Sequence, residues 1–102
     1  MEELLLFRRE LDELDRQLID TLSERFAICR QVAEYKAQHS VPMMQPGRVL
    51  EVKQKAVQRA VPAGLSERFA LELYDLIISE ACRMEDEIID NASAARLAMA
   101  SA

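Results

Sequence analysis

Apolar residues recur every three or four positions along the first forty residues of this chain. They are Leu4, Phe7, Leu11, Leu14, Leu18, Ile28, Val32 and Tyr35. This spacing is typical of a helix with one packed face, and no glycine or proline interrupts residues 2–39. The pattern predicts one helix of about 55 Å, at a rise of about 1.5 Å per residue. A domain of this size has a radius of gyration near ~13 Å, so the chain cannot cover such a helix alone.

The stretch VPMMQPGRV, residues 41–49, ends this pattern. Pro42 disfavours helical backbone before it, whereas Pro46 suits the first turn of a second helix, where its missing N–H has no partner to lose. One face of this short helix, of roughly four turns, carries Val49, Val52, Ala56 and Ala60. The segment PAGLS, residues 62–66, closes it, and Ser66 is a predicted N-cap for a third helix.

The third helix is apolar over an unusually wide arc. Its apolar positions include Phe69, Leu73, Leu76, Ile77, Met84 and Ile88. At 100° per residue, Leu76 and Ile89 bound an arc of about 220°, which indicates burial on more than one side. We expect one all-α domain over residues 1–90, with a long, a short and a medium helix in an intertwined homodimer. Residues 91–102, NASAARLAMASA, are expected to form a frayed or flexible tail.

Composition narrows the possible partners. The 102 residues are half apolar, and 18 acidic against 13 basic residues give a net charge of −5. An acidic chain disfavours nucleic acid and anionic membranes as partners. Cys29 and Cys82 have no metal-ligand or disulfide spacing, so we expect two reduced thiols and no metal. The start shows neither a signal peptide nor a membrane span, and we expect a cytoplasmic protein.

Several charged residues break the apolar pattern. Arg25 occupies a seam position, and Lys36 lies about 20° around and roughly 16 Å along the same helix, so the two share a face. Glu85 lies inside the apolar arc of the third helix, where desolvation raises a carboxyl pKa. Arg48 stands in the first turn of the second helix, where unpaired backbone N–H groups favour an anion. Arg8 points about 100° away from Arg25, toward a partner's site in an intertwined dimer.

These residues predict a site that binds a small dianion and carries out any chemistry by electrostatics. Two simpler interpretations stay open. Arg8 alone is equally well explained as a solvated side chain, and Glu85 as half of a buried ion pair with Arg25 or Arg48.

The spaced charged residues resemble the all-α chorismate mutase family. They are Arg8, Asp15 within LDELD, Arg25, Lys36, Arg48 and Glu85. The resemblance runs without a gap from about Leu6 to Ile89. It implies a three-helix, intertwined homodimer with two active sites, each borrowing an arginine from the other chain, and a rearrangement that needs no cofactor or metal.

The resemblance also implies a role for each residue. Arg8 would be the borrowed arginine, and Arg25 and Arg48 would hold the two carboxylates of the substrate. Lys36 would contact the ether oxygen and a carboxylate, and Glu85 would donate to the same ether oxygen.

Three further positions depart from the ordinary chorismate mutases. Val49 stands where they have a glutamate that accepts from the ring hydroxyl, Gln45 replaces an aspartate and Ala81 a serine. The segment VPMMQPGRV, together with YDLIISEACRMEDEII at residues 74–89, is similar to the 4-amino-4-deoxychorismate mutases of aromatic-amine antibiotic pathways. Three alternatives stay open: a chorismate mutase acting on chorismate, an isochorismate pyruvate lyase, and a helical dimer module without catalysis.

Overall fold

The computed structural model describes the backbone of residues 1–42 and 46–101, and the side chains of residues 1–42, 47–92 and 98. Three helices make up the described fold: α1 (Glu2–His39), α2 (Pro46–Ala60) and α3 (Glu67–Ser101). The all-α prediction and the bounds of α1 and α2 are confirmed. The predicted end of the third helix near residue 90 is wrong, because α3 continues to Ser101. With 35 residues against 38 in α1, it is not a medium helix. The flexibility of residues 91–102 stays a prediction.

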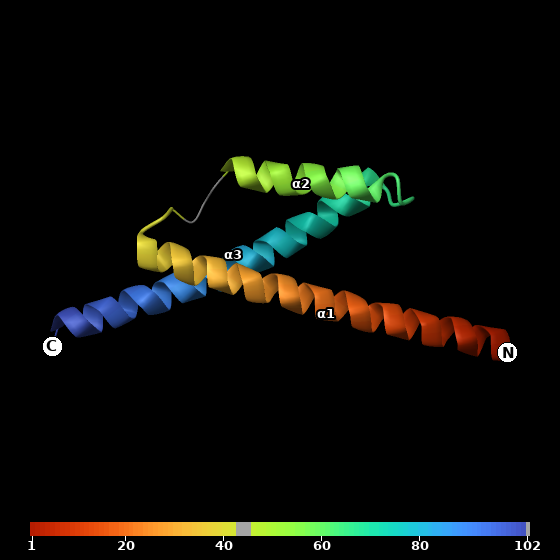
Figure 1. The fold of residues 1–102 in the computed structure, drawn as a ribbon, viewed down its shortest axis with the longest axis horizontal. Coiled ribbons are helices and arrows are strands. Elements are labelled where there is room, and N and C mark those ends of the chain that lie inside the picture. Colours follow the sequence, from red (N-terminus) through yellow and green to blue (C-terminus); the bar gives the residue numbers. More distant parts are fainter. Residues whose placement is uncertain (43–45, 102) are drawn as a thin grey trace.

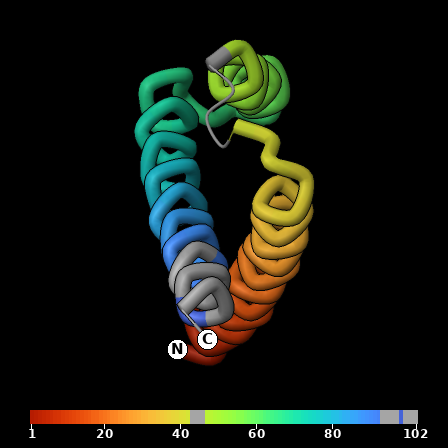
Figure 2. The backbone as a smooth tube through the Cα atoms, turned by 90° about the vertical axis from the view of Figure 1, so that its left-hand side faces the viewer, coloured from red at the N-terminus to blue at the C-terminus, as the bar shows by residue number. Residues whose placement is uncertain are grey.

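The third helix connects the other two in space. It contacts both α1 and α2, and Figure 1 shows it running diagonally between them. In the end view of Figure 2, α1 and α3 form two sides and α2 lies at the top, and residues of all three helices line the cavity described below. The site is therefore positioned by α3, which holds the other two helices apart at a set distance.

Local chemistry explains where the helices begin and end. Ser40 adopts left-handed backbone (φ 55°) at the end of α1, and the N–H of Val41 donates to the Lys36 carbonyl at 3.0 Å. Gly64, at φ 89°, turns the chain between α2 and α3 in a conformation that glycine adopts without strain. The Ser66 hydroxyl accepts from the Phe69 N–H at 3.0 Å, which confirms the predicted N-cap.

The core within one chain is small and consists mostly of alanine. Its members are Ala33, Ala56, Ala60, Ala70, Ile77, Ala81 and Met84. Alanine lets helices approach closely, but it buries little apolar surface, and burial of that surface is the main favourable term in folding. Among the described residues, no large side chain is fully buried. The contacts of a single chain therefore supply only part of a normal core.

The chain is long and thin, with extents of 67 × 30 × 16 Å and a radius of gyration of 18.6 Å. Its accessible surface is 8166 Å², whereas a compact monomer of 11.6 kDa exposes about 5,800 Å². Residues 1–21 are all exposed. They include the apolar seam, which we define as Leu4, Phe7, Leu11, Leu14 and Leu18, and each of its members is at least half exposed.

In the part of the chain that the structure describes, no helix is long and apolar enough to cross a bilayer.

Candidate active site

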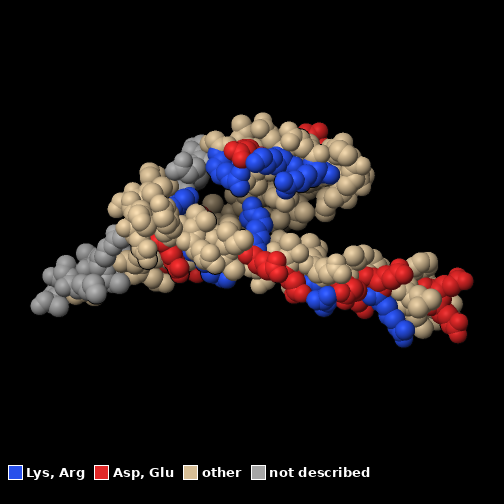
Figure 3. Space-filling view, in the orientation of Figure 1, with Lys and Arg blue, Asp and Glu red and all other residues tan. Residues whose placement is uncertain are grey.

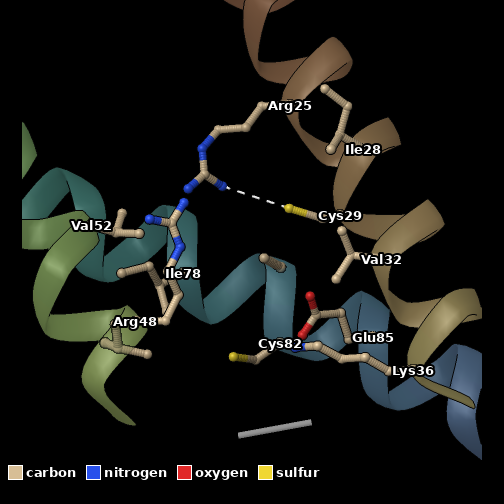
Figure 4. A pocket seen from close by; sticks show the side chains of 12 residues that line it. Arg25, Ile28, Cys29, Val32, Lys36, Arg48, Val52, Ile78, Cys82 and Glu85 are labelled. Atoms are coloured by element: carbon tan, nitrogen blue, oxygen red, sulfur yellow. Dashed lines mark hydrogen bonds between the residues drawn. The ribbon is translucent and has the colours of Figure 1, made fainter. Parts of the chain in front are cut away.

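A cavity of about 320 Å³ lies between the three helices. Six of the eight residues predicted to form the site line it: Arg25, Lys36, Arg48, Val49, Ala81 and Glu85. They come from α1, α2 and α3, and are up to sixty residues apart in the sequence. Figure 4 shows most of these side chains directed into the same space. The arrangement thus brings together residues that the sequence analysis selected separately.

One face of α1 forms a wall of this cavity. Arg25, Cys29, Val32 and Lys36 follow one another at intervals of four, three and four residues. At 3.6 residues per turn, this spacing puts them in a row along the helix. The predicted common face of Arg25 and Lys36 is confirmed, because both side chains reach the same cavity from positions about three turns apart.

Arg25 is held on two sides. Its Nη1 lies 3.7 Å from the Sγ of Cys29, one turn along α1, and its guanidinium carbon lies 5.9 Å from the ring centroid of Tyr74 on α3. A guanidinium over an aromatic face is attracted to the electron-rich ring, which restricts where the group can point. The thiol and the ring therefore orient the arginine without neutralising its charge.

Arg48 approaches the cavity from the first turn of α2. Its Nη1 donates to Glu51 Oε1 at 2.8 Å, and the same carboxylate oxygen accepts from Lys55 at 2.8 Å. Arg48 and Arg25 lie on the same side of the cavity (Figure 4). Two guanidinium groups beside one cavity repel each other unless an anion lies between them, so their placement favours a negatively charged ligand.

Lys36 and Glu85 lie on the opposite side, from α1 and α3 (Figure 4). Burial raises the pKa of the Glu85 carboxyl above its ordinary value, and Asp86 adds to this, while the nearby Lys36 ammonium opposes it. The direction agrees with the prediction that desolvation acts on this carboxyl. Among the ion pairs of the described residues, none joins Glu85 to Arg25 or Arg48, so the alternative of a structural pair with these arginines is not found.

The remaining wall of the cavity is apolar or weakly polar. Val49 and Val52 contribute from α2, and Ile78, Ala81 and Cys82 from α3. Burial raises the pKa of the Cys82 thiol, and the carboxylates of Glu85 and Asp86 reinforce this. Cys82 therefore stays protonated and is a poor nucleophile near neutral pH. Such a wall lowers the local polarity on its side of the cavity, which strengthens the interactions of the charges that face it.

Two predicted residues are not part of this cavity. Gln45 lies outside the described residues. Arg8 lies in the exposed first part of α1, and the seventeen residues between it and Arg25 correspond to about 25 Å along the helix. Arg8 therefore cannot reach the cavity of its own chain, and its predicted role depends on a second copy.

The sequence analysis missed Tyr74 and the role of Cys29. Cys29 was interpreted only as a reduced thiol, and Tyr74 was given no role. A usable signal existed for Cys29, because it lies one helical turn after Arg25 on the same face. Nothing in the sequence indicated that Tyr74 and Arg25 would meet, since they come from different helices.

The assembled site combines two arginines and a lysine with one carboxyl whose pKa is raised. The described residues include no group of three or more histidine, cysteine, aspartate or glutamate side chains placed to hold a metal ion. No histidine lines the cavity among these residues. The arrangement suits a small ligand with two negative charges, whose reacting atoms it can hold and polarise by hydrogen bonding and fixed charge.

Similarity to known proteins gives an independent view of the chain. The sequence profile of the family described as chorismate mutase type II matches residues 7–86. The chain is 48% identical over 91 residues to a 4-amino-4-deoxychorismate mutase of Streptomyces venezuelae, covering 89% of this chain and 88% of that relative. It is 44% identical over 87 residues to a protein of the same name from Streptomyces pristinaespiralis, covering 85% of this chain and 67% of that relative.

A more distant relative is the bifunctional chorismate mutase/prephenate dehydratase of Aquifex aeolicus, 31% identical over 91 residues, which cover 86% of this chain and 25% of that protein. The matched region contains α1 from Phe7 onward, all of α2 and α3 as far as Asp86, and with them every described residue that lines the cavity. Mutases of this kind are isomerases. The profile match, the relatives and the cavity agree, and the chain belongs to the chorismate mutase type II family.

Proposed function

We propose that this protein catalyses the [3,3]-sigmatropic rearrangement of 4-amino-4-deoxychorismate to 4-amino-4-deoxyprephenate. The observation that carries this proposal is the single cavity lined by Arg25, Arg48, Lys36 and Glu85. The two Streptomyces relatives that bear the name 4-amino-4-deoxychorismate mutase support the choice of substrate. We further propose that the enzyme works in the cytoplasm and supplies an aromatic-amine antibiotic pathway.

The reaction takes place within one molecule. The ether C–O bond breaks while a new C–C bond forms between the enolpyruvyl arm and the ring, so atoms and electrons balance without a cofactor. In the proposal, Arg25 and Arg48 bind the two carboxylates and hold the arm over the ring. Positioning of this kind lowers the barrier because the reactive conformer is rare in solution.

Lys36 and Glu85 have the second task. Negative charge develops on the ether oxygen as its bond to carbon breaks. The Lys36 ammonium and the protonated Glu85 carboxyl are proposed to donate to this oxygen, and donors that are already fixed in place stabilise such charge strongly. The raised pKa of Glu85 supports this role, because only the protonated carboxyl can donate.

We propose that the working form is an intertwined homodimer in which Arg8 of one chain completes the site of the other. The exposed apolar seam supports this, as does an accessible surface that exceeds the expectation for a compact monomer by about 2,300 Å². Obligate dimers commonly bury 2,000–5,000 Å² in total. Arg8 lies on the same part of α1 as the apolar seam, so a helix docking there carries the arginine with it.

The ring-facing residues are proposed to be Val49 and Ala81, with Gln45 beside them in the loop. Val49 is apolar and lines the cavity near Arg48, so it leaves the ring substituent without a carboxylate partner there. We propose that these three positions adapt the site to the amino analogue.

Product analysis with three substrates tests the reaction. Purified protein is incubated separately with chorismate, 4-amino-4-deoxychorismate and isochorismate, and products are separated by chromatography. We expect 4-amino-4-deoxyprephenate to form fastest. Faster formation of prephenate would make this an ordinary chorismate mutase, pyruvate release from isochorismate would make it a lyase, and no product with any substrate would favour a non-catalytic module.

Mixing two inactive variants tests the shared site. Arg8→Ala and Arg25→Ala subunits are unfolded together, refolded at equal ratio and assayed. Random pairing makes half of the dimers mixed, and each mixed dimer has one site with both arginines, so about one quarter of the parental activity is expected. A mixture as inactive as its components would exclude the exchange of Arg8.

A further inference from the structure

A second hollow of about 200 Å³ lies beside the main cavity. It shares Arg25, Arg48 and Val52 with that cavity, so the two spaces are neighbours with common walls. Its other charged lining residues are Lys55 and Arg59 of α2. Neither of these two has a part in the proposed reaction.

The cations of α2 form a row along one side of the helix. Arg48, Lys55 and Arg59 are seven and four residues apart, which places them within an arc of about 40° and over roughly 16 Å of helix. We call these three residues the cationic row. Figure 3 shows the blue side chains following one another along α2, next to the opening toward α1. The row begins at the cavity with Arg48 and leads away from it.

Positive charge in this hollow exceeds the available negative charge. Four cations line it, and none of its described lining residues is acidic. The adjacent Glu51 carboxylate accepts from both Arg48 and Lys55 at 2.8 Å, so one negative charge faces four positive charges and an excess of three remains. The chain as a whole carries a net charge of −5. The cationic row is thus a positively charged region on a protein of negative net charge, and such a region attracts small anions.

We propose that the second hollow is an outer anion site, in which Lys55 and Arg59 capture the dicarboxylate substrate before it enters the catalytic cavity. The identity of the anion rests on the proposed function. The side chain of Lys55 is half exposed, so water screens its attraction and the anion is not held tightly. Arg25 and Arg48 face both spaces, so a carboxylate bound in the outer site already touches groups that bind it in the inner one.

The rate of binding tests this proposal directly. The association and dissociation rates of a bicyclic dicarboxylate that mimics the transition state are measured by stopped flow for the parent and for Lys55→Gln/Arg59→Gln. Rim charges act mainly on association. We expect association to fall about 3- to 10-fold at low salt. Dissociation is expected to stay within about twofold, and the difference in association to disappear near ~0.5 M salt.

Arg68→Gln/Arg83→Gln is the matched control. It removes the same two charges from exposed positions on α3 that are paired with Glu72 and with Glu80 and Glu87. An equal loss in the control would mean that net charge, not the row, sets the rate. A shifted monomer–dimer equilibrium in the row variant, with an unchanged association rate, would make the row a subunit contact. Either result overturns the outer site.

The same measurements separate this proposal from the proposed reaction. Suppose that the parent rearranges 4-amino-4-deoxychorismate but that the parent and the Lys55→Gln/Arg59→Gln variant bind the dicarboxylate at the same rate. This result would reject the outer site and leave the proposed reaction intact. Conversely, suppose that the parent binds the dicarboxylate faster than the variant and yet fails to rearrange 4-amino-4-deoxychorismate. This result would reject the proposed reaction and leave the outer site intact.

Discussion

The two halves of α1 differ in what covers them. Residues 1–21 are exposed without exception, although they include five seam residues at regular helical spacing. From Leu22 onward, several side chains of the same helix are partly covered although others stay exposed, Ala33 is fully buried, and Arg25 and Lys36 line the cavity. One uninterrupted helix thus has a half that packs within its own chain and a half that does not.

This difference shows what an apolar pattern does and does not specify. The three-and-four spacing is the same in both halves, because it specifies only which face of a helix is buried. Which surface covers that face depends on the arrangement of the helices, and here α3 reaches only the second half (Figure 1). The first half needs a surface from outside the chain, and we have proposed a second copy.

The largest effect is expected from placing charged residues in the apolar seam, in the first half of α1. In Leu11→Glu/Leu18→Glu, two carboxylates enter the proposed interface, and an unpaired buried charge costs about 3–5 kcal/mol. We expect the dimer to dissociate and activity to be lost, as measured by sedimentation velocity and product formation. Ser23→Glu, which adds a charge at an exposed position off the seam, is expected to change neither. A double variant that sediments like the parent would remove the basis for the dimer.

A change in the second half is expected to act on chemistry and not on assembly. Lys36→Ala removes a proposed donor to the developing charge, so kcat should fall about 10²- to 10³-fold, or roughly 3–4 kcal/mol of barrier. Sedimentation is expected to match the parent. Lys53→Ala is a control, since Lys53 pairs with Asp75 and does not line the cavity. A change confined to KM would mean that Lys36 only binds substrate.

Glu85, which lies on the same side of the cavity as Lys36, gives a smaller, pH-dependent effect. Because the pKa of Glu85 is raised, more of this carboxyl is protonated at a given pH, and that fraction falls as pH rises through the raised pKa. Parental kcat should therefore decline with rising pH, whereas Glu85→Gln, whose amide donates at every pH, should keep a flatter profile. In Glu80→Gln the profile should follow the parent, since Arg83 lowers the pKa of Glu80. Parallel decline of parent and Glu85→Gln would exclude the donor role.

Changes on the polar face of the first half of α1 are expected to have the smallest effect on stability and association. Arg16 forms exposed ion pairs with Glu13 and Asp20, and exposed pairs of this kind contribute little to stability. We expect Arg16→Ala to leave the urea midpoint and the sedimentation coefficient unchanged within error. Loss of association in this variant would show that the interface extends beyond the apolar seam.

Much of the site was predictable because its residues violate a pattern. Arg25 and Glu85 stand at positions where apolar residues are expected, and Arg48 stands at a helix start, so each could be selected without knowledge of the fold. Helix geometry predicted that Arg25 and Lys36 share a face, and their charges together with those of Arg48 and Glu85 predicted one site, which the family resemblance supported. The packing of α3 between α1 and α2 is what brings them together, and spacing within one helix does not specify such packing.

Other features left no comparable signal. Lys55 and Arg59 were missed because charged residues on a short amphipathic helix are usually a solvated face. The end of α3 was misjudged for a different reason: the simple composition of residues 91–102 was interpreted as a tail, yet alanine has the highest intrinsic helix propensity. Local preference extends the helix there.

The exposed first half of α1 also has a consequence for biosynthesis. These residues leave the ribosome before α2 and α3 exist, so their apolar face is uncovered from the moment of translation, and neither α2 nor α3 shields it afterwards. In the dimer that we have proposed, maturation requires two polypeptides to meet, and the rate of this step falls with the square of the concentration of the chain. Neighbouring ribosomes on one messenger would supply such a meeting most readily.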